Sequence, residues 1–298
     1  MINMDSPSVI QIVNEIASKY NIVGRTTELR QMVLAIRAKK HLLIEGEVGV
    51  GKTRLAKALS EYLGAQFYRI DGSEDVLSYV LVGFFDPPSV VAGGYTEEAF
   101  IYGPLALAMR NGGCLFINEI NRIPEASQNI LLTALDEGIL EVPKLTTIRA
   151  EPSFFVVATQ NPEAHVGVTA LGEALKDRFV WVKLEYQPQE EEEAIAVQEA
   201  DLHGKGQREI ANLAVRITRA TRDHEDIRQG ASVRAAIDIA ALVKANGPMQ
   251  PEETAERWIE VAIMALATKI ELMDGATDSR EEIIKRIVLE ALQNSPFA

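Results

Sequence analysis

Glycine, lysine and threonine recur with a distinctive spacing in one short stretch of this sequence. Gly46 and Gly51 frame the pattern G-x-x-x-x-G-K-S/T, which Lys52 and Thr53 complete. Glycines let a chain curl tightly enough to point its backbone N–H groups at phosphate oxygens, beside the positive end of a helix. Lys52 can then reach the β- and γ-phosphates of a nucleoside triphosphate, and the Thr53 hydroxyl can bind Mg²⁺. The spacing therefore predicts a phosphate-binding loop.

The residues on either side of this loop support that prediction. Apolar residues 42–44 are typical of a strand and residues 54–63 of a helix, which is the context that a phosphate-binding loop needs. We therefore expect the whole loop and the first helical residues to contact ATP. The predicted contact residues are Gly46, Glu47, Val48, Gly49, Val50, Gly51, Lys52, Thr53 and Arg54.

A second group of polar residues follows an apolar run that is typical of a buried strand. Asn118 and Glu119 come directly after residues 114–117, and ligands of open α/β sheets bind at the carboxyl ends of strands. Hydrolysis of a bound triphosphate needs a metal ion and a positioned water. We expect Glu119 to orient or deprotonate that water. Asn118 is expected beside Mg²⁺, although an acid is the usual hard ligand there and Asn offers only a neutral oxygen.

Asn161 and two arginines are further candidates for triphosphate chemistry. Asn161 follows another apolar strand, where its amide could hydrogen-bond a γ-phosphate or the attacking water, or could cap the turn before Pro162. The sequence leaves both alternatives open. Arg178 and Arg234 are candidates for stabilising charge in the transition state, an effect worth ~10³–10⁵ in rate. Because a lone arginine on a helix is by default a surface residue, only context can select these two.

Strands and helices must position these residues, and their pattern changes once along the chain. Up to Gln187, strand-like apolar runs alternate with helical patterns, which predicts a parallel sheet covered on both faces. Beyond that point we expect only helices. We therefore predict an α/β domain over residues 1–187, an αβα sandwich built around the phosphate-binding loop. An all-helical domain is expected over residues 188–298.

Three segments stand out from this regular pattern. Glycines and prolines cluster between residues 71 and 103, where we expect an irregular insertion with a short hairpin through residues 90–101. Residues 139–150 hold two short apolar stretches around a central proline, which predicts a second hairpin. The run of glutamates at residues 190–193 is interpreted as a solvated helical turn rather than a metal site.

Composition narrows the classes of function. The chain has 298 residues, of which 47% are hydrophobic and 24% charged, and its formal net charge is −13. That charge disfavours a protein that depends on nucleic-acid phosphates and favours protein partners. The N-terminus lacks a secretory pattern, no apolar run reaches the roughly 18 residues of a membrane helix, and Cys114 is the single cysteine. We expect a cytoplasmic protein without membrane insertion.

Together these motifs resemble those of the AAA+ ATPases and, within them, the MoxR family. The resemblance covers nearly the whole chain, and the order and spacing of its segments are more specific than any single segment. The matching segments are GEVGVGKT at 46–53, GPL at 103–105, FINEINR at 116–122, ATQNP at 158–162, DRF at 177–179 and GASVRA at 230–235.

The resemblance implies a nucleotide-binding αβα domain followed by a helical lid. It implies that Asn161 is sensor 1, that Arg178 is an arginine finger acting on a neighbour's ATP, and that Arg234 is the sensor 2 arginine. Sensor 2 in this clade can also act across the subunit interface. Ile22 and Val23 match the stretch that packs near the adenine.

The two segments that interrupt the regular pattern also have counterparts in this family, and one residue departs from the family's usual sequence. Residues 89–102 match the insertion in helix 2, and residues 139–150 match the hairpin before sensor 1; both usually face the pore of a ring. The departure is Asn118, where the family usually has Asp. Since the family's acid holds Mg²⁺ largely through water, an amide oxygen can substitute with weaker electrostatics. We therefore expect hydrolysis that is slow or needs more Mg²⁺.

The resemblance also implies a working assembly. It predicts ATP and Mg²⁺ as cofactors, a hexameric ring, and a chaperone role in assembling or activating other protein complexes, often with a partner that carries a von Willebrand factor A domain. Two alternatives stay open. One is a nucleotide-binding switch with weak hydrolysis because of Asn118. The other is a nucleic-acid-translocating ring, which the second hairpin disfavours because residues 142–146 hold a single lysine.

Overall fold

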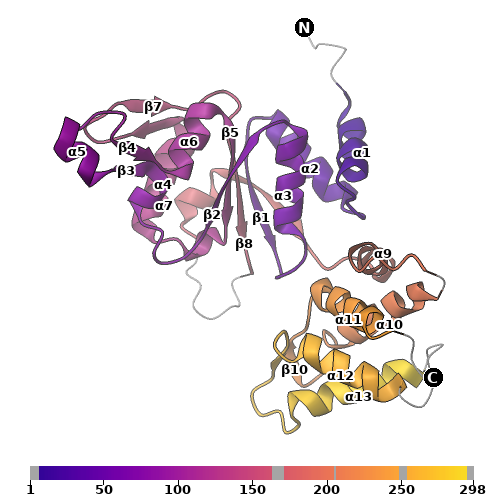
Figure 1. Ribbon diagram of the computed structural model, residues 1–298. Coiled ribbons are helices and arrows are strands. Elements are labelled where there is room, and N and C mark those ends of the chain that lie inside the picture. The colour runs from indigo at the N-terminus through magenta and orange to yellow at the C-terminus, as the bar shows by residue number, and fades with distance from the viewer. Residues whose placement is uncertain (1–6, 163–170, 205, 248–253, 294–298) are drawn as a thin grey trace. The chain divides into compact units, whose positions relative to one another are not determined.

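A computed structural model describes residues 7–162, 171–204, 206–247 and 254–293 of the protein. The chain divides into two compact units, each with its own apolar core (Figure 1). Among these residues, no helix is both long and apolar enough to cross a membrane. The first unit comprises Met1–Glu47 and Gly51–Glu185, and the second comprises Val48–Val50 and Tyr186–Ala298.

A five-stranded sheet forms the centre of the first unit. Its strands lie in the order β2-β5-β8-β1-β9, and every neighbouring pair is parallel. The central strands are almost continuously buried, as expected when helices cover both faces of a parallel sheet. The strands are β1 (His41–Gly46), β2 (Gln66–Asp71), β5 (Gly113–Asn118), β8 (Phe155–Gln160) and β9 (Phe179–Leu184).

Helices cover both faces of this sheet, which confirms the predicted fold class (Figure 1). One face packs against α2 and α3, and the other against α4, α6 and α7. Ser60 of α3 hydrogen-bonds Cys114 of β5, so the side of β5 that carries Cys114 faces α3. The helices are α1 (Val9–Lys19), α2 (Thr26–Arg37), α3 (Lys52–Tyr62), α4 (Ser78–Val82), α6 (Pro104–Asn111), α7 (Glu125–Asp136) and α8 (Glu173–Lys176), with a short 3₁₀ helix η1 (Ile120–Arg122).

An inserted strand–helix–strand segment separates α4 from α6. β3 (Gly83–Phe85) and β4 (Phe100–Tyr102) form an antiparallel pair, and α5 (Pro87–Gly93) lies between them in sequence. The structure contradicts the expected hairpin through residues 90–101. The strand pair begins at Gly83, before the predicted insertion of residues 89–102, whose bounds stay a prediction.

Local capping chemistry explains why a helix forms in this glycine- and proline-rich segment. The Asp86 carboxylate accepts a hydrogen bond from the backbone N–H of Ser89 at 3.1 Å, which caps α5. Pro87 and Pro88 occupy the first helical positions, where no backbone N–H is needed. The prolines therefore start a helix in the segment where the glycine and proline content predicted an irregular insertion.

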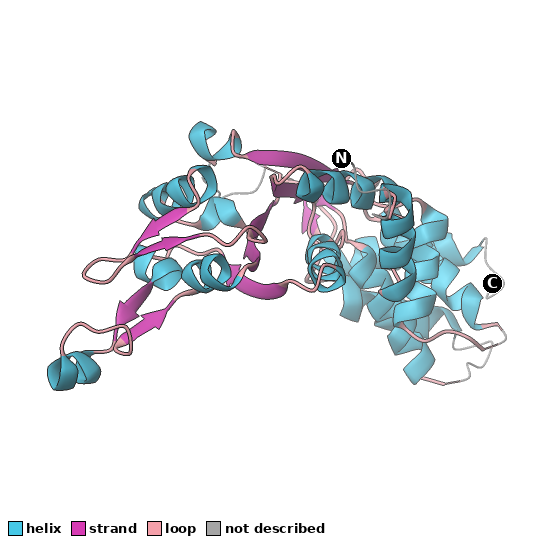
Figure 2. Cartoon of the chain, turned by 90° about the horizontal axis from the view of Figure 1, so that it is seen from above, coloured by secondary structure: helices cyan, strands magenta, loops and turns pink. Residues whose placement is uncertain are grey.

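A second antiparallel pair lies before β8, where the sequence predicts a hairpin. β6 (Ile139–Glu141) and β7 (Thr147–Arg149) form it. At its tip the Lys144 ammonium lies 3.7 Å from the centre of the Tyr95 ring, which belongs to the loop between α5 and β4. Figure 2 shows the short strand pairs projecting from one end of this unit. The cation–π contact joins the two projecting segments.

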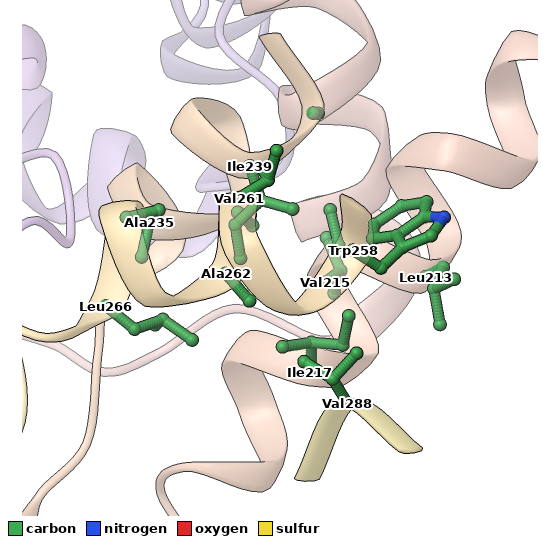
Figure 3. Packing of buried hydrophobic residues seen from close by; sticks show 14 of the residues in the cluster. Leu213, Val215, Ile217, Ala235, Ile239, Trp258, Val261, Ala262, Leu266 and Val288 are labelled. Atoms are coloured by element: carbon green, nitrogen blue, oxygen red, sulfur yellow. The ribbon is translucent and has the colours of Figure 1, made fainter. Parts of the chain in front are cut away.

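The second unit is built from helices around one apolar core (Figure 3). Trp258 is fully buried there, and Leu213 and Val288 bring two other helices into the same cluster. Fully burying a large aromatic ring is a major contribution to such a core. The helices are α9 (Gln189–Glu199), α10 (Gln207–Ala220), α11 (Val233–Ala245), α12 (Thr254–Leu266) and α13 (Arg280–Gln293).

This unit is not entirely helical, which corrects the sequence prediction. β10 (Ile227–Gln229) and β11 (Glu271–Leu272) form a short antiparallel pair. Strands this short show no alternating pattern, so periodicity cannot reveal them. Residues 248–253, which precede α12, lie outside the described residues, and α12 ends at Leu266.

Glu192 corrects the interpretation of the acidic run in α9. Its side chain is only 3% exposed, and its carboxylate contacts Arg219 Nη1 at 3.0 Å and Arg222 Nη1 at 2.9 Å. Residues 192 and 196 are one helical turn apart, so Glu192 shares the buried face of Ala196. A carboxylate can be buried only when opposite charges and hydrogen bonds compensate it. Glu192 is therefore a structural ion-pair residue rather than a solvated one.

We predict that Glu192→Gln destabilises the protein by about 3–5 kcal/mol, because it leaves two arginines without their buried counter-charge. Urea unfolding followed by circular dichroism measures this. Glu190→Gln is the matched control, since Glu190 lies in the same helical turn and is exposed. Its effect should stay within about 0.5 kcal/mol. Equal effects of the two substitutions would contradict the assignment of Glu192.

Candidate functional site

The phosphate-binding loop connects the carboxyl end of β1 to the amino end of α3. Gly46 ends the strand, and Lys52 and Thr53 begin the helix. Gly49 and Gly51 have φ angles of +86° and +97°, in the left-handed region that residues with a side chain rarely adopt. The glycine spacing is thus required by the backbone of the loop. Helix α3 presents its amino end, with the partial positive charge of that end, to the loop.

Lys52 holds the loop together from within. Its ammonium donates to the backbone oxygens of Gly46 at 2.6 Å and Glu47 at 2.9 Å, and to Asn161 Oδ1 at 2.9 Å. The residue is only 8% exposed. A buried ammonium group needs such acceptors, because desolvation disfavours its charge. The charged group expected to meet phosphate therefore lies inside the loop, at the same edge of the sheet as Asn161.

Asn161 connects Lys52 to Glu119. Asn161 follows β8, and its Nδ2 donates to Glu119 Oε1 at 3.2 Å while its Oδ1 accepts from Lys52. The other carboxylate oxygen of Glu119 accepts from Arg122 Nη1 at 2.8 Å. The structure thus brings together three residues that the sequence singled out separately. Asn161 uses both ends of its amide in this row.

Glu119 is fixed by an unusual backbone conformation. Its φ and ψ are 53° and 55°, the left-handed region that costs a non-glycine residue free energy. Its backbone N–H donates to Thr159 Oγ1 at 3.1 Å, and Thr159 is fully buried. A Cβ at Gly72 would lie 2.1 Å from the backbone oxygen of Glu119, so only glycine lets the chain after β2 pass here. The backbone strain is therefore held by close neighbours on both sides.

Asn118 lies in a second hydrogen-bonded row that crosses three strands. Thr159 Oγ1 donates to Asn118 Oδ1 at 3.0 Å, and Asn118 Nδ2 donates to Asp71 Oδ1 at 3.0 Å. Hydrogen bonds from Arg69, with a smaller contribution from Asn118, hold the pKa of Asp71 below its usual value. Asp71 and Thr159 are not among the site residues predicted from the sequence. A signal was present for Asp71, since it ends β2 as Asn118 ends β5.

The oxygen groups at this edge fit a magnesium ion. Thr53 offers a hydroxyl, Asn118 an amide oxygen and Asp71 a carboxylate, all of them the hard ligands that Mg²⁺ prefers. Within the described residues there is no cluster of three or more His, Cys, Asp or Glu side chains able to hold a metal. Mg²⁺ in nucleotide sites usually binds phosphates and water with one or two protein groups, so such a cluster is not required.

Arg54 brings the predicted adenine-side stretch to the start of α3. Its Nη2 donates to the backbone oxygen of Asn21 at 3.1 Å and lies 3.4 Å from that of Tyr20. Ile22 and Val23 follow directly and are half-buried. The structure therefore places this stretch beside the helix that begins at the phosphate-binding loop.

Arg178 lies at the opposite edge of the sheet. It directly precedes β9, whose first residue, Phe179, pairs with His41 at the amino end of β1. The phosphate-binding loop leaves β1 at its carboxyl end, so the strand length of about 17 Å separates the two. The guanidinium Nε and Nη2 of Arg178 donate to the carboxylate of Asp136 at 2.7–2.9 Å. These bonds hold the pKa of Asp136 below its usual range.

Arg234 belongs to the second unit. It is the second residue of α11 and is exposed. The buried hydroxyl of Thr221 accepts from the backbone N–H of Ala231, and Arg222 Nε donates to the backbone oxygen of Ala231. The segment before α11 is therefore anchored firmly to the end of α10. The expected role of Arg234 stays a prediction.

Sequence comparisons agree with this geometry. The profile of the AAA domain (dynein-related subfamily) matches residues 41–179. The chain is 32% identical to the uncharacterized protein YeaC of Bacillus subtilis over 248 residues, which is 75% of this chain and 73% of that protein. It is 30% identical to an uncharacterized protein of Staphylococcus aureus over 212 residues, which is 68% of this chain and 78% of that protein.

Solved structures share the fold. The crystal structure of a "putative ATPase" from Cytophaga hutchinsonii aligns over 94% of each chain, with a TM-score of 0.51 and 24% identity. A variant of RuvB from Thermotoga maritima aligns over 91% of this chain and 70% of its own, with a TM-score of 0.52 and 18% identity. At these identities the likeness shows the fold alone. The sequence relatives and the AAA profile go further, and we conclude that the chain belongs to the AAA+ ATPase family, with an AAA domain over residues 41–179.

Proposed function

We propose that this protein binds ATP together with Mg²⁺ and hydrolyses ATP to ADP and phosphate. The observation that carries the proposal is the hydrogen-bonded row from Lys52 through Asn161 to Glu119. This row begins inside the phosphate-binding loop and ends on a carboxylate. A phosphate-binding cation, a polar sensor and a group that can orient water are the parts that phosphoryl transfer to water requires.

Each residue of the row has a distinct role in this proposal. The loop amides and Lys52 bind the phosphates, while Glu119 orients the attacking water and accepts its proton. Asn161 contacts both residues, so it experiences any change at either one. When Lys52 turns toward a phosphate, Asn161 Oδ1 loses its donor and becomes available to accept a hydrogen bond from the attacking water. This is the behaviour expected of a sensor.

The metal site of the proposal uses residues at the same edge. Mg²⁺, when bound, supplies neutralising charge for the phosphates. Thr53 would hold it directly through its hydroxyl, and Asn118 would hold it through water. The loop, with Ile22 and Val23 beside α3, would bind the remainder of the nucleotide.

The position of Arg178 supports a site shared between two copies of the chain. Arg178 and the phosphate-binding loop of the same chain lie at opposite edges of the sheet, farther apart than an arginine side chain can span. A role for Arg178 in hydrolysis is therefore possible only at a neighbour's nucleotide. We propose that it acts there as an arginine finger, and that Arg234 stabilises charge as the sensor 2 residue.

We further propose that the protein is a MoxR-like member of the family. In this role it forms a hexameric ring in the cytoplasm and uses ATP to assemble or activate other protein complexes. Its proposed partner carries a von Willebrand factor A domain. What supports this is the set of sequence segments that resemble that family, together with the two projecting strand pairs joined by Lys144 and Tyr95.

One alternative has a specific observation in its favour. Asn118 lacks the charge of an acid, which favours a nucleotide-binding switch with weak hydrolysis. The nucleic-acid alternative gains no such support, because Lys144 in the second hairpin lies over the Tyr95 ring. Steady-state phosphate release separates the enzyme from the switch.

Glu119→Gln should lower the rate of ATP hydrolysis at least about a hundredfold, because an amide cannot accept the proton of the attacking water. Nucleotide affinity should change little. A phosphate-release assay across a wide range of Mg²⁺ concentrations measures the first, and binding of a fluorescent ATP analogue measures the second. Glu125→Gln is the control, since Glu125 is an exposed acid just after η1. Turnover that does not depend on Glu119 would refute hydrolysis at this site.

Arg178→Ala should lower hydrolysis about 10³-fold or more, while nucleotide binding stays intact. Mixing Arg178→Ala chains with Glu119→Gln chains should then restore part of the activity. In mixed assemblies an intact Glu119 from one chain meets an intact Arg178 from the next. Lack of any recovery, in assemblies shown to contain both chains, would rule out action across the interface.

Assembly should depend on the shared site. We expect mass photometry to show a species of about six chains when ATP and Mg²⁺ are present, and smaller species without them. The Glu119→Gln chain is the suitable material, because it keeps bound ATP intact. A monomer under all conditions would contradict both the ring and the role of Arg178.

A further inference from the structure

Asn118 is oriented by hydrogen bonds with side chains on both neighbouring strands. Its Oδ1 accepts from Thr159 on β8, and its Nδ2 donates to Asp71 Oδ1 on β2 at 3.0 Å. Both ends of the amide are thus used, and the donor end is turned to a carboxylate. An aspartate in place of Asn118 could not make this contact, because an ionised carboxylate has no hydrogen to donate.

The register of the sheet places Asp71 on the face that is covered by α3. Asp71 pairs with Asn118 across β2 and β5. Side chains alternate between the two faces along a strand, so Asn118 shares the face of Cys114, which hydrogen-bonds Ser60 of α3. The first turn of α3 carries Thr53, the predicted hydroxyl ligand of Mg²⁺. Asp71 therefore lies on the same face, and at the same edge, as the magnesium site.

Arg69 keeps Asp71 charged and oriented. Its Nε and Nη2 donate to the carboxylate at distances of 2.6–3.1 Å, and these bonds hold the pKa of Asp71 below its usual value. The Asp71 side chain is still 58% exposed. In the described part of the chain, Oδ2 accepts only from Arg69 Nε. A carboxylate oxygen has room for more than one donor, so Asp71 can also accept from a water.

We propose that Asp71 supplies the carboxylate of the magnesium site that Asn118 lacks, and that Asn118 is the positioning residue that aims it. This rests on the proposed function, because it assumes a nucleotide with Mg²⁺ at the loop. Enzymes with this loop hold Mg²⁺ with the loop Ser or Thr and an acid from another strand. Here Thr53 is the hydroxyl and Asp71 is the acid, one strand farther from β1. Mg²⁺ keeps several of its waters, so an acid can act on it through one of them.

Asp71 and Asn118 are complementary because one is an acid and the other an amide. Carboxylates at both positions would lie about as close as the 3.0 Å that now separates Asn118 from Asp71. Like charges at that distance disfavour ionisation of one of them, so a second acid would add little charge. One acid and one amide give the site a single ionised carboxylate held by a hydrogen bond. Exchanging the two residues preserves both features.

The test compares how tightly the full-length parent chain and its variants bind Mn²⁺ when ADP is bound. Mn²⁺ serves as the probe for Mg²⁺. Electron paramagnetic resonance counts free Mn²⁺ directly and needs no turnover. Asp71→Asn should weaken Mn²⁺ binding about tenfold or more, as loss of an outer-shell partner typically does. Asp71→Glu should retain most of the affinity, because it keeps the charge. The exchanged double variant, Asp71→Asn with Asn118→Asp, should bind Mn²⁺ nearly as tightly as the parent chain.

Asp75→Asn is the matched control, since Asp75 is an exposed acid shortly after β2 and its loss changes the net charge equally. Thermal melting of each variant checks that the fold is kept. If Asp71→Asn binds Mn²⁺ as tightly as Asp75→Asn, or if the exchanged variant is no tighter than Asp71→Asn, the inference is overturned. Failure of the proposed function looks different: without a nucleotide site the parent chain binds no ADP, and without hydrolysis it binds ADP and Mn²⁺ but releases no phosphate from ATP.

Discussion

The direction of the strands is the constraint on which the site depends. Because β1, β5 and β8 are parallel neighbours, the polar residues that follow them meet at one edge of the sheet. Lys52, Glu119 and Asn161 are far apart in sequence but contact one another there. The same direction puts Arg178, which precedes β9, at the other edge. The parallel direction of the strands thus places Lys52, Glu119 and Asn161 together and places the proposed arginine finger, Arg178, at the opposite edge.

Much of the fold and of the candidate site could be predicted because the sequence patterns that indicate them are local. The loop is defined by glycines within eight residues, and the left-handed angles of Gly49 and Gly51 show why glycine is needed. Alternating strands and helices imply a parallel sheet, and a parallel sheet implies a shared edge for Asn118 and Asn161. The fold class follows from the same alternation. Each of these inferences uses residues that are adjacent in sequence or a rule about strand direction.

The remaining features depend on contacts between distant residues. Asp136 and Arg178 are 42 residues apart, and Asp71 and Asn118 are 47 apart, so no local pattern links them. Glu192 was misinterpreted because a run of acids is usually solvated, although helical periodicity places it on the face of Ala196. In each case the missing information was which charges the fold brings together. Composition and spacing do not contain it.

Lys52 illustrates what a fully occupied site means for a ligand. An ammonium group has three N–H donors, and the oxygens of Gly46, Glu47 and Asn161 accept from it. A phosphate must therefore exchange with acceptors that are already in place. The contribution of Lys52 to the free energy of nucleotide binding is the difference between two sets of charge-assisted hydrogen bonds, so it is smaller than either set alone. The loop is already curled around the Lys52 ammonium, and such preorganisation lowers the entropic cost of ordering it on binding.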